Sequence, residues 1–133
     1  MRRMSIPFVA LIMVFSVRCS NGTGPSLGDE VKLNYGQSIV LEDGALTVEF
    51  MSVAGESRCP EGVTCVWEGN AEIRVQVSSA EMTETYALNT TLNPQFVEHQ
   101  GYKIDLLSVD PYPMYKQSVE FEEYSITLDI TEE

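Results

Sequence analysis

The sequence predicts an all-β protein, a single antiparallel β-sandwich or flattened barrel of about eight short strands behind an N-terminal signal segment. Apolar and polar residues alternate with a period of two in several segments, which is typical of strands with one face in a core and one in water. Turn-forming residues separate these segments at short intervals. Beyond residue 18, no segment shows the 3.6-residue period of an amphipathic helix.

Residues 1–18 have the features of a secretory signal peptide. Two arginines precede an apolar run over residues 6–17, which is shorter than the about 20 residues that span a bilayer. Cys19 follows directly and resembles the lipidated cysteine of a bacterial lipoprotein, with residues 19–29 as a flexible tether. Because Arg18 stands where such motifs usually have a small residue, an ordinary secreted protein and an uncleaved anchor are the alternatives.

Residues 30–133 form the single predicted domain, and its charge limits the choice of partner. All 20 acidic residues but only five of the eight basic ones lie beyond position 18, so residues 19–133 carry a formal charge of −15. Nucleic acid is excluded as a partner, because binding a polyphosphate begins with a basic patch. Contact with an anionic membrane is expected only through the N-terminal lipid.

The first strands precede the cysteine residues of the domain. Two short apolar segments, 31–33 and 38–41, are separated by Asn34-Tyr35-Gly36, which predicts an edge strand and a turn. Residues 46–51 alternate regularly, and Val53 then breaks the phase, which predicts a bulge in this strand.

The stretch Ser57–Val77 contains the longest alternation in the chain. Apolar residues occupy the odd positions from Cys65 onward, so we expect a central strand from Cys65 to Val77 with Trp67 in the middle of the core. Gly69 and the following asparagine interrupt the pattern and predict a bulge or sharp bend.

The second half of the chain predicts further short strands. Leu107 and Val109 break the alternation of residues 102–106 ahead of a proline-containing loop, as a strand does when it leaves one layer or becomes buried on both faces. Three glutamates, Glu120, Glu122 and Glu123, are expected to be edge-strand charges that oppose aggregation. The predicted segments are 82–88, 95–97, 102–106, 119–121 and 124–130, with a hairpin turn over 98–101.

Cys59 and Cys65 are predicted to form a structural disulfide. If Cys19 is lipidated, they remain as an even pair in an exported chain, and disulfides persist in such compartments. The alternative is a metal-binding or redox site made by Cys59, Cys65 and His99. Two observations disfavour that alternative: the spacing is CxxxxxC rather than CxxC, and no second cysteine pair accompanies it. His99 is expected to be a surface residue of a turn.

The segment Asp110–Tyr115, DPYPMY, is the predicted binding site. Tyr112, Met114 and Tyr115 stand among prolines, which would hold them as a rigid and partly exposed aromatic surface. The alternative is that these rings cap the open end of the sandwich. No catalytic residue, cofactor or metal ligand is predicted, because the single histidine has no identifiable nucleophile or orienting group and the carboxylates are scattered.

One motif supports the predicted location. Ser57-Arg58-Cys59-Pro60, followed by Val63, Cys65, Trp67 and Gly69, resembles the pattern SRCPxxVxCxWxG of small uncharacterised lipoproteins and envelope proteins of bacteria. The resemblance implies a cell-envelope protein and carries no activity with it. From the sequence we therefore expect an exported, lipid-anchored β-domain that binds or supports another envelope component, without enzymatic activity.

Overall fold

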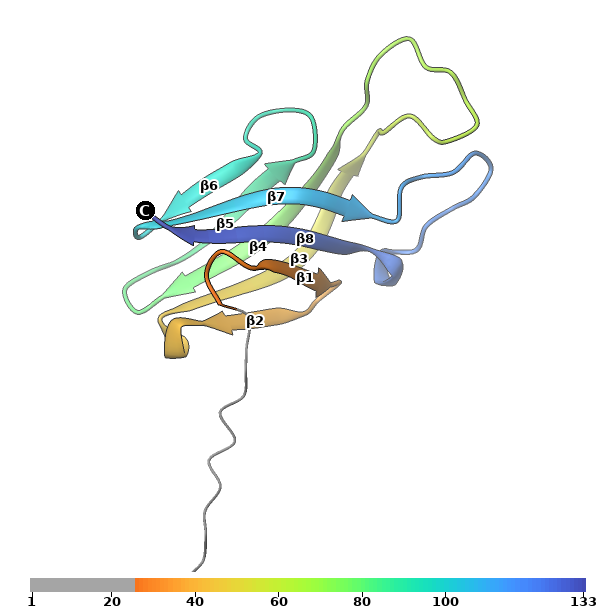
Figure 1. The fold of residues 1–133 in the computed structure, drawn as a ribbon. Coiled ribbons are helices and arrows are strands. Elements are labelled where there is room, and N and C mark those ends of the chain that lie inside the picture. Colours follow the sequence, from red (N-terminus) through yellow and green to blue (C-terminus); the bar gives the residue numbers. More distant parts are fainter. Residues whose placement is uncertain (1–25) are drawn as a thin grey trace, which may run out of the picture.

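The fold is the predicted all-β sandwich, seen in a computed structural model that describes residues 26–133 (Figure 1). Two antiparallel four-stranded sheets are stacked on each other and do not close into a barrel. The predicted signal segment, Cys19 and the first part of the tether lie outside the described residues. Across the described part of the chain, no helix is long and apolar enough to cross a membrane.

Eight strands and two single turns of 3₁₀ helix make up the fold. One sheet has the strand order β1-β8-β7-β6, and the other has the order β2-β3-β4-β5. The elements are β1 (Glu30–Asn34), β2 (Ser38–Leu41), η1 (Glu42–Gly44), β3 (Leu46–Glu56), β4 (Ala71–Ser79), β5 (Thr83–Asn89), β6 (Phe96–His99), β7 (Tyr102–Asp110), η2 (Phe121–Glu123) and β8 (Ser125–Glu132).

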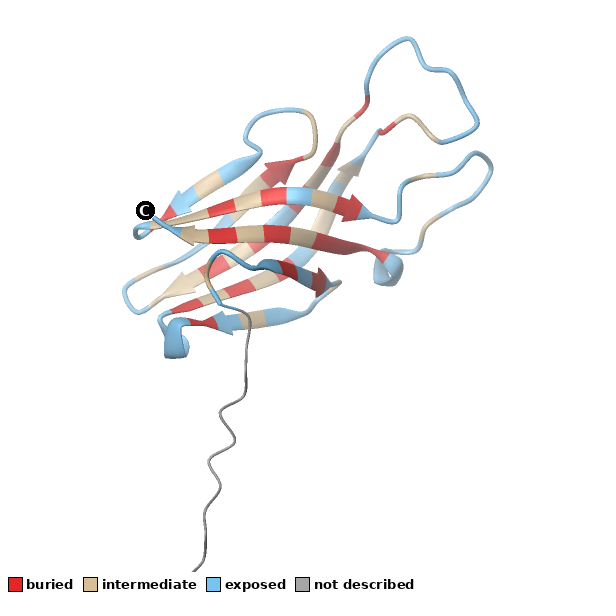
Figure 2. Ribbon diagram, viewed as in Figure 1, coloured by how far each residue is buried: buried red, intermediate tan, exposed pale blue. Residues whose placement is uncertain are grey.

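The core lies between the sheets, where alternate residues of the strands are buried (Figure 2). The period of two in the sequence thus sets which side chains face inward. The predicted break at Val53 is a bulge in β3, where the pairing with β4 shifts twice between Phe50 and Gly55. Leu107 is likewise the extra residue of a bulge in β7 and is exposed rather than buried on both faces.

The two ends of the sandwich differ in the length of their connections. Three long loops, 57–70, 90–95 and 111–124, lie at one end, here called the loop end (Figure 1). Short turns join the strands at the other end, here called the turn end. The start of the described chain also lies at the turn end, because the Gly28 backbone N–H donates to the carbonyl of Ile130 near the end of β8, at 2.8 Å.

The predicted strand at 119–121 is wrong, and so is the edge-strand role of its glutamates. These residues belong to the 111–124 loop, where η2 is a single 3₁₀ turn with a capping box. The Glu120 N–H donates to Glu123 Oε2 at 3.1 Å. Phe121 stacks on Tyr35, with ring centroids 6.2 Å apart. The segment is short and pairs with no strand among residues 26–133, so local hydrogen bonds and this aromatic contact decide its conformation.

Candidate functional site

The 57–70 loop closes through a narrow neck at Ser57 and Asn70. The Ser57 N–H donates to the Asn70 carbonyl at 2.8 Å, and the Asn70 N–H donates to Ser57 Oγ at 3.1 Å. Gly69 lies so close that an added Cβ would stand 1.7 Å from the Ser57 carbonyl oxygen. The expected strand from Cys65 is therefore wrong before Ala71, where β4 begins, because this close approach ends the β3–β4 ladder.

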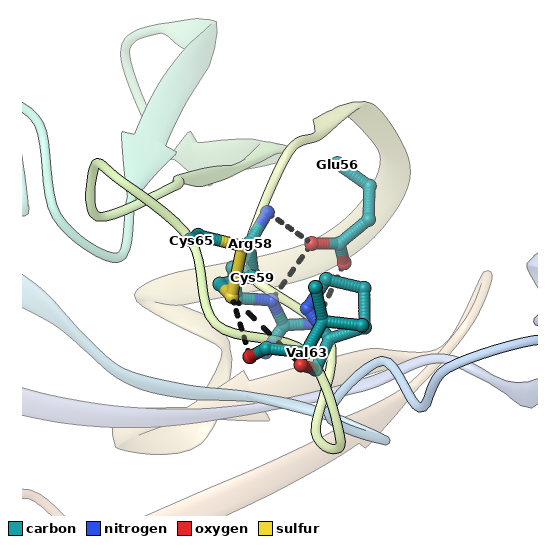
Figure 3. The surroundings of a disulfide bond; sticks show 6 residues. Glu56, Arg58, Cys59, Val63 and Cys65 are labelled. Carbon is teal, nitrogen blue, oxygen red and sulfur yellow. Dashed lines mark hydrogen bonds and ion pairs between the residues drawn. A yellow bond between two sulfur atoms is a disulfide. The ribbon is translucent and has the colours of Figure 1, made fainter.

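Cys59 and Cys65 form the predicted disulfide within this loop (Figure 3). Their Cα atoms are 5.9 Å apart. Inside the bridge, the Val63 N–H donates to the Pro60 carbonyl at 3.3 Å and closes a turn. The disulfide thus constrains a short segment that extends beyond both sheets.

Arg58 joins the 57–70 loop to the end of β7 and the start of the 111–124 loop. Its side chain is only 7% exposed and makes a two-pronged ion pair with Glu56, with Nε–Oε1 at 2.8 Å and Nη2–Oε2 at 2.7 Å (Figure 3). Nη1 donates to the Val109 carbonyl at 2.7 Å, and Nη2 donates to that of Pro111 at 3.1 Å. The guanidinium carbon also lies 5.0 Å from the Tyr112 ring centroid. We call Arg58 and Glu56 the arginine clamp.

Tyr124, the residue before β8, completes the arginine clamp. Its hydroxyl donates to Glu56 Oε2 at 3.3 Å. Burial raises the pKa of Tyr124, and the negative charge of Glu56 raises it further. The phenol therefore remains a hydrogen-bond donor to the carboxylate well into the alkaline range.

A second junction joins the disulfide loop directly to the DPYPMY segment. The Glu61 N–H donates to the Pro113 carbonyl at 2.9 Å, and the Tyr115 N–H donates to the Glu61 carbonyl at 3.0 Å. Glu61 and Met114 thereby form an isolated parallel bridge. The disulfide loop and the predicted binding segment are consequently joined by backbone hydrogen bonds.

The 90–95 loop is held to the same end of the sandwich by Asn70. Its side-chain Oδ1 accepts hydrogen bonds from the backbone N–H groups of Thr91 at 3.0 Å and Leu92 at 3.1 Å. The Thr91 hydroxyl donates to the Gly69 carbonyl at 2.9 Å. All three long loops are therefore connected by hydrogen bonds.

The expected burial of Trp67 is wrong, since its side chain is 73% exposed. The alternation from Cys65 onward placed it on the inner face of a strand, but Trp67 lies in the loop beyond the neck, outside both sheets. Sequence alone offered no sign of this other than Gly69, whose lack of a side chain permits the approach to Ser57 that ends the strand.

Exposed apolar side chains gather at the loop end. Of the twelve large exposed apolar residues in the described chain, eight lie on its three loops. Tyr112, Met114 and Tyr115 are all among them, which is the exposure that the predicted binding site requires. The loop-end residues are Val63, Val66, Trp67, Leu92, Tyr112, Met114, Tyr115 and Phe121.

An open pocket of about 590 Å³ lies between the 111–124 loop and the outer side of the β1–β8–β7 sheet. Tyr112, Met114 and Val119 supply its apolar lining. Its charged lining consists of two carboxylates and one ammonium group, from Asp110, Glu123 and Lys32. The pocket is thus continuous with the predicted binding segment and carries a formal charge of −1.

The predicted surface position of His99 is wrong, since its side chain is only 2% exposed. His99 ends β6 at the turn end, where its Nδ1 lies 2.8 Å from the Tyr86 hydroxyl and its Nε2 lies 3.2 Å from Ser79 Oγ. Burial raises the pKa of Tyr86, and Glu84 adds to this effect. Partners from two strands of the other sheet satisfy the ring, an arrangement that could not be read from the residues next to His99.

The residues of the alternative metal or redox site do not come together. Cys59 and Cys65 are joined in a disulfide at the loop end, whereas His99 lies at the turn end of the sandwich. Within residues 26–133, no three or more His, Cys, Asp or Glu side chains are placed to hold one metal ion.

The fold and the loop end together define a small β-sandwich that presents an apolar surface on connected loops. Comparison with protein-family models, curated proteins and solved structures finds no match to this chain.

Proposed function

We propose that the protein is an envelope-tethered binding module whose loop end contacts another component of the bacterial cell envelope. The gathering of exposed apolar side chains on the three long loops carries this proposal. Large exposed apolar patches on soluble domains mark interaction sites, and aromatic anchors such as Trp67, Tyr112 and Tyr115 are enriched in interface hot spots.

The connections between the loops favour binding over a merely exposed surface. The disulfide, the arginine clamp and the Glu61–Tyr115 junction hold the loops in one arrangement before any partner arrives. A preorganised surface loses little conformational entropy on binding, so more of the contact energy appears as affinity.

The position of the tether supports the same role. We propose that residues 1–18 direct export, that Cys19 is lipidated, and that the chain up to residue 29 is the tether. Gly28 lies at the turn end, through its bond to Ile130. A lipid at Cys19 would thus hold the turn end toward the membrane and leave the loop end facing the aqueous space.

Site-directed photocrosslinking in the native bacterium tests the binding surface. Trp67 and Tyr115 are each replaced by p-benzoylphenylalanine, and Val40 and Leu107, which are exposed on strands, serve as matched control positions. We expect a discrete adduct from each loop position and none from the control positions. Adducts of equal yield from all four positions, or from none of them, would contradict the proposal.

The intact mass of the exported protein tests the anchor. We expect a chain that begins at Cys19, carries added lipid and lacks two hydrogens because of the disulfide. The Cys19→Ser variant is expected to lose the lipid mass and leave the membrane fraction. A full-length chain without lipid would contradict the anchor while leaving the loop-end surface to the crosslinking test.

A further inference from the structure

The loop end is acidic as well as aromatic. The acidic residues of the 57–70 and 110–124 segments are Glu61, Glu68, Asp110, Glu120, Glu122 and Glu123. Arg58 is paired with Glu56, so Lys116 is the one exposed basic residue of these segments. A partner that covers this surface has to offset negative charge while it covers apolar side chains.

The aromatic rings of this surface already hold cations within the chain. Lys116 Nζ lies 5.3 Å from the Tyr115 ring centroid, and the guanidinium carbon of Arg58 lies 5.0 Å from that of Tyr112. These distances fall within the range over which a ring face attracts a cation. The same residue types on a partner would find equivalent contacts on the exposed indole of Trp67.

The pocket beneath the 111–124 loop is suited to a long basic side chain. Asp110 and Glu123 place carboxylates in its wall, and Tyr112, Met114 and Val119 supply apolar surface for an aliphatic stem. One oxygen of each carboxylate accepts a bond within the chain, from Ser108 Oγ at 3.3 Å and from the Glu120 N–H at 3.1 Å. The second oxygen of each accepts no hydrogen bond from residues 26–133 and can accept one from a ligand.

We propose that the loop end recognises a protein segment in which lysine or arginine alternates with apolar residues, and that one basic side chain enters the pocket between Asp110 and Glu123. This proposal rests on the proposed function and specifies its partner. A second copy of this chain is disfavoured as the occupant, because residues 19–133 of each copy carry a formal charge of −15. An anionic membrane surface is disfavoured for the same reason.

Three synthetic ten-residue peptides serve as probes, measured by fluorescence anisotropy. They consist of alternating arginine and leucine, arginine and serine, or glutamate and leucine. We expect the arginine–leucine peptide to bind at least tenfold more tightly than the arginine–serine peptide, because only the former adds leucine side chains that cover the exposed apolar residues of the loops. Equal binding of both arginine peptides would show general charge attraction and overturn the proposal.

Variants at the surface separate specific from general attraction. The double variant Trp67→Ser/Tyr115→Ser is expected to weaken binding of the arginine–leucine peptide about tenfold. The matched double variant Val40→Ser/Leu107→Ser also removes two exposed apolar residues, and both of these lie on strands. It is expected to bind as the parent does, and equal weakening by both double variants would overturn the proposal.

Charge variants of the pocket test which kind of group enters it. Asp110→Asn/Glu123→Gln is expected to weaken binding of the arginine–leucine peptide about tenfold. Lys32→Gln is expected to strengthen binding about threefold, because this change removes a positive charge from the pocket lining. Weaker binding after Lys32→Gln would identify an anionic ligand group and overturn the proposal.

The two proposals fail in different ways. If Trp67 and Tyr115 give crosslinks in cells but the protein does not prefer the arginine–leucine peptide, the loop end is still a binding surface and the proposal of a basic partner is wrong. Absence of loop-specific crosslinks would contradict the binding surface itself.

Discussion

Gly69 lies against the backbone of Ser57 at the neck of the disulfide loop, where no other residue type fits. A Cβ at this position would lie 1.7 Å from the Ser57 carbonyl oxygen and 2.5 Å from Arg58 Cα. Real Cβ contacts do not approach so closely, and both obstacles are backbone atoms. Arg58 directly follows Ser57, so the neck sets the position from which Arg58 reaches β7 and the 111–124 loop.

Gly69→Ala is therefore expected to lower the free energy of unfolding by about 3 kcal/mol or more, because the neck has to open. Urea denaturation followed by far-ultraviolet circular dichroism measures the change. Gly55→Ala in β3 is the matched control, since the added Cβ would meet nothing closer than 4.0 Å. A cost for Gly69→Ala no larger than that for Gly55→Ala would contradict this account of the neck.

Arg58→Met tests the arginine clamp. The change leaves the Glu56 carboxylate and the Val109 carbonyl without their cationic partner in a largely buried place. Removing one partner of a buried ion pair typically costs about 3 to 5 kcal/mol, and because the Glu56 side chain is 23% exposed we expect the low end of this range.

Arg74→Met is the matched control for the arginine clamp. Arg74 pairs with Glu72 at 3.1 Å, but its side chain is 44% exposed, and exposed pairs contribute less than about 1 kcal/mol. Urea denaturation of both variants gives the comparison. Equal costs would show that Arg58 acts as an ordinary surface charge.

The fold could be predicted from the sequence because its strands follow a simple rule. A period of two identified most strands, and the phase break at Val53 correctly located a bulge. The break at Leu107 also marks a bulge, but it was interpreted as a strand that leaves one layer or becomes buried on both faces. The cysteine pair was likewise identified from spacing and predicted compartment.

Trp67 and His99 show where this reasoning fails. Apolar and polar residues still alternate through Cys65 and Trp67, although these residues lie in the loop between β3 and β4. A loop sequence can alternate by chance, so the pattern did not show where the strand begins. His99 is flanked by polar residues, and the hydroxyls that make its burial tolerable come from Tyr86 and Ser79, far along the chain. Contacts of this kind are tertiary and have no local signal.

The buried environment of His99 is expected to contribute strongly to stability. His99→Ala leaves a cavity and removes the partner of the Tyr86 and Ser79 hydroxyls, for an expected loss of about 2 to 4 kcal/mol. Thermal and urea denaturation measure it. Glu84→Ala, an exposed change on the adjacent strand β5, is expected to shift stability by less than about 0.5 kcal/mol. A similarly small effect of His99→Ala would contradict the buried position.

Cys59→Ser/Cys65→Ser tests the link between the disulfide and the DPYPMY segment. In the chain-entropy model, loss of this short bridge costs about 2 to 2.5 kcal/mol. Because Glu61 inside the bridge pairs with Pro113 and Tyr115, we also expect faster hydrogen exchange at the Glu61 and Tyr115 amides. The Ile104 amide in β7 is the internal control, after correction for the global loss of stability. Unchanged exchange at Tyr115 would separate the two loops energetically.

Tyr124 gives the domain a defined alkaline response. Burial and Glu56 raise the pKa of its phenol above the ordinary value of about 10, so the folded protein keeps this proton over a pH interval in which the unfolded chain loses it. The associated stability is fully present below pH 10 and is lost as the pH rises through the folded-state pKa.

Tyr124→Phe is expected to be about 1 kcal/mol less stable than the parent at pH 8, because it loses the hydrogen bond to Glu56. Between about pH 9.5 and 11 the variant is expected to lose less stability than the parent. Tyr86, whose pKa burial also raises, keeps part of the response in that variant. Urea denaturation across this range, with tyrosinate absorbance to follow ionisation, measures both slopes, and equal slopes for parent and variant would show that Tyr124 does not ionise late in the folded state.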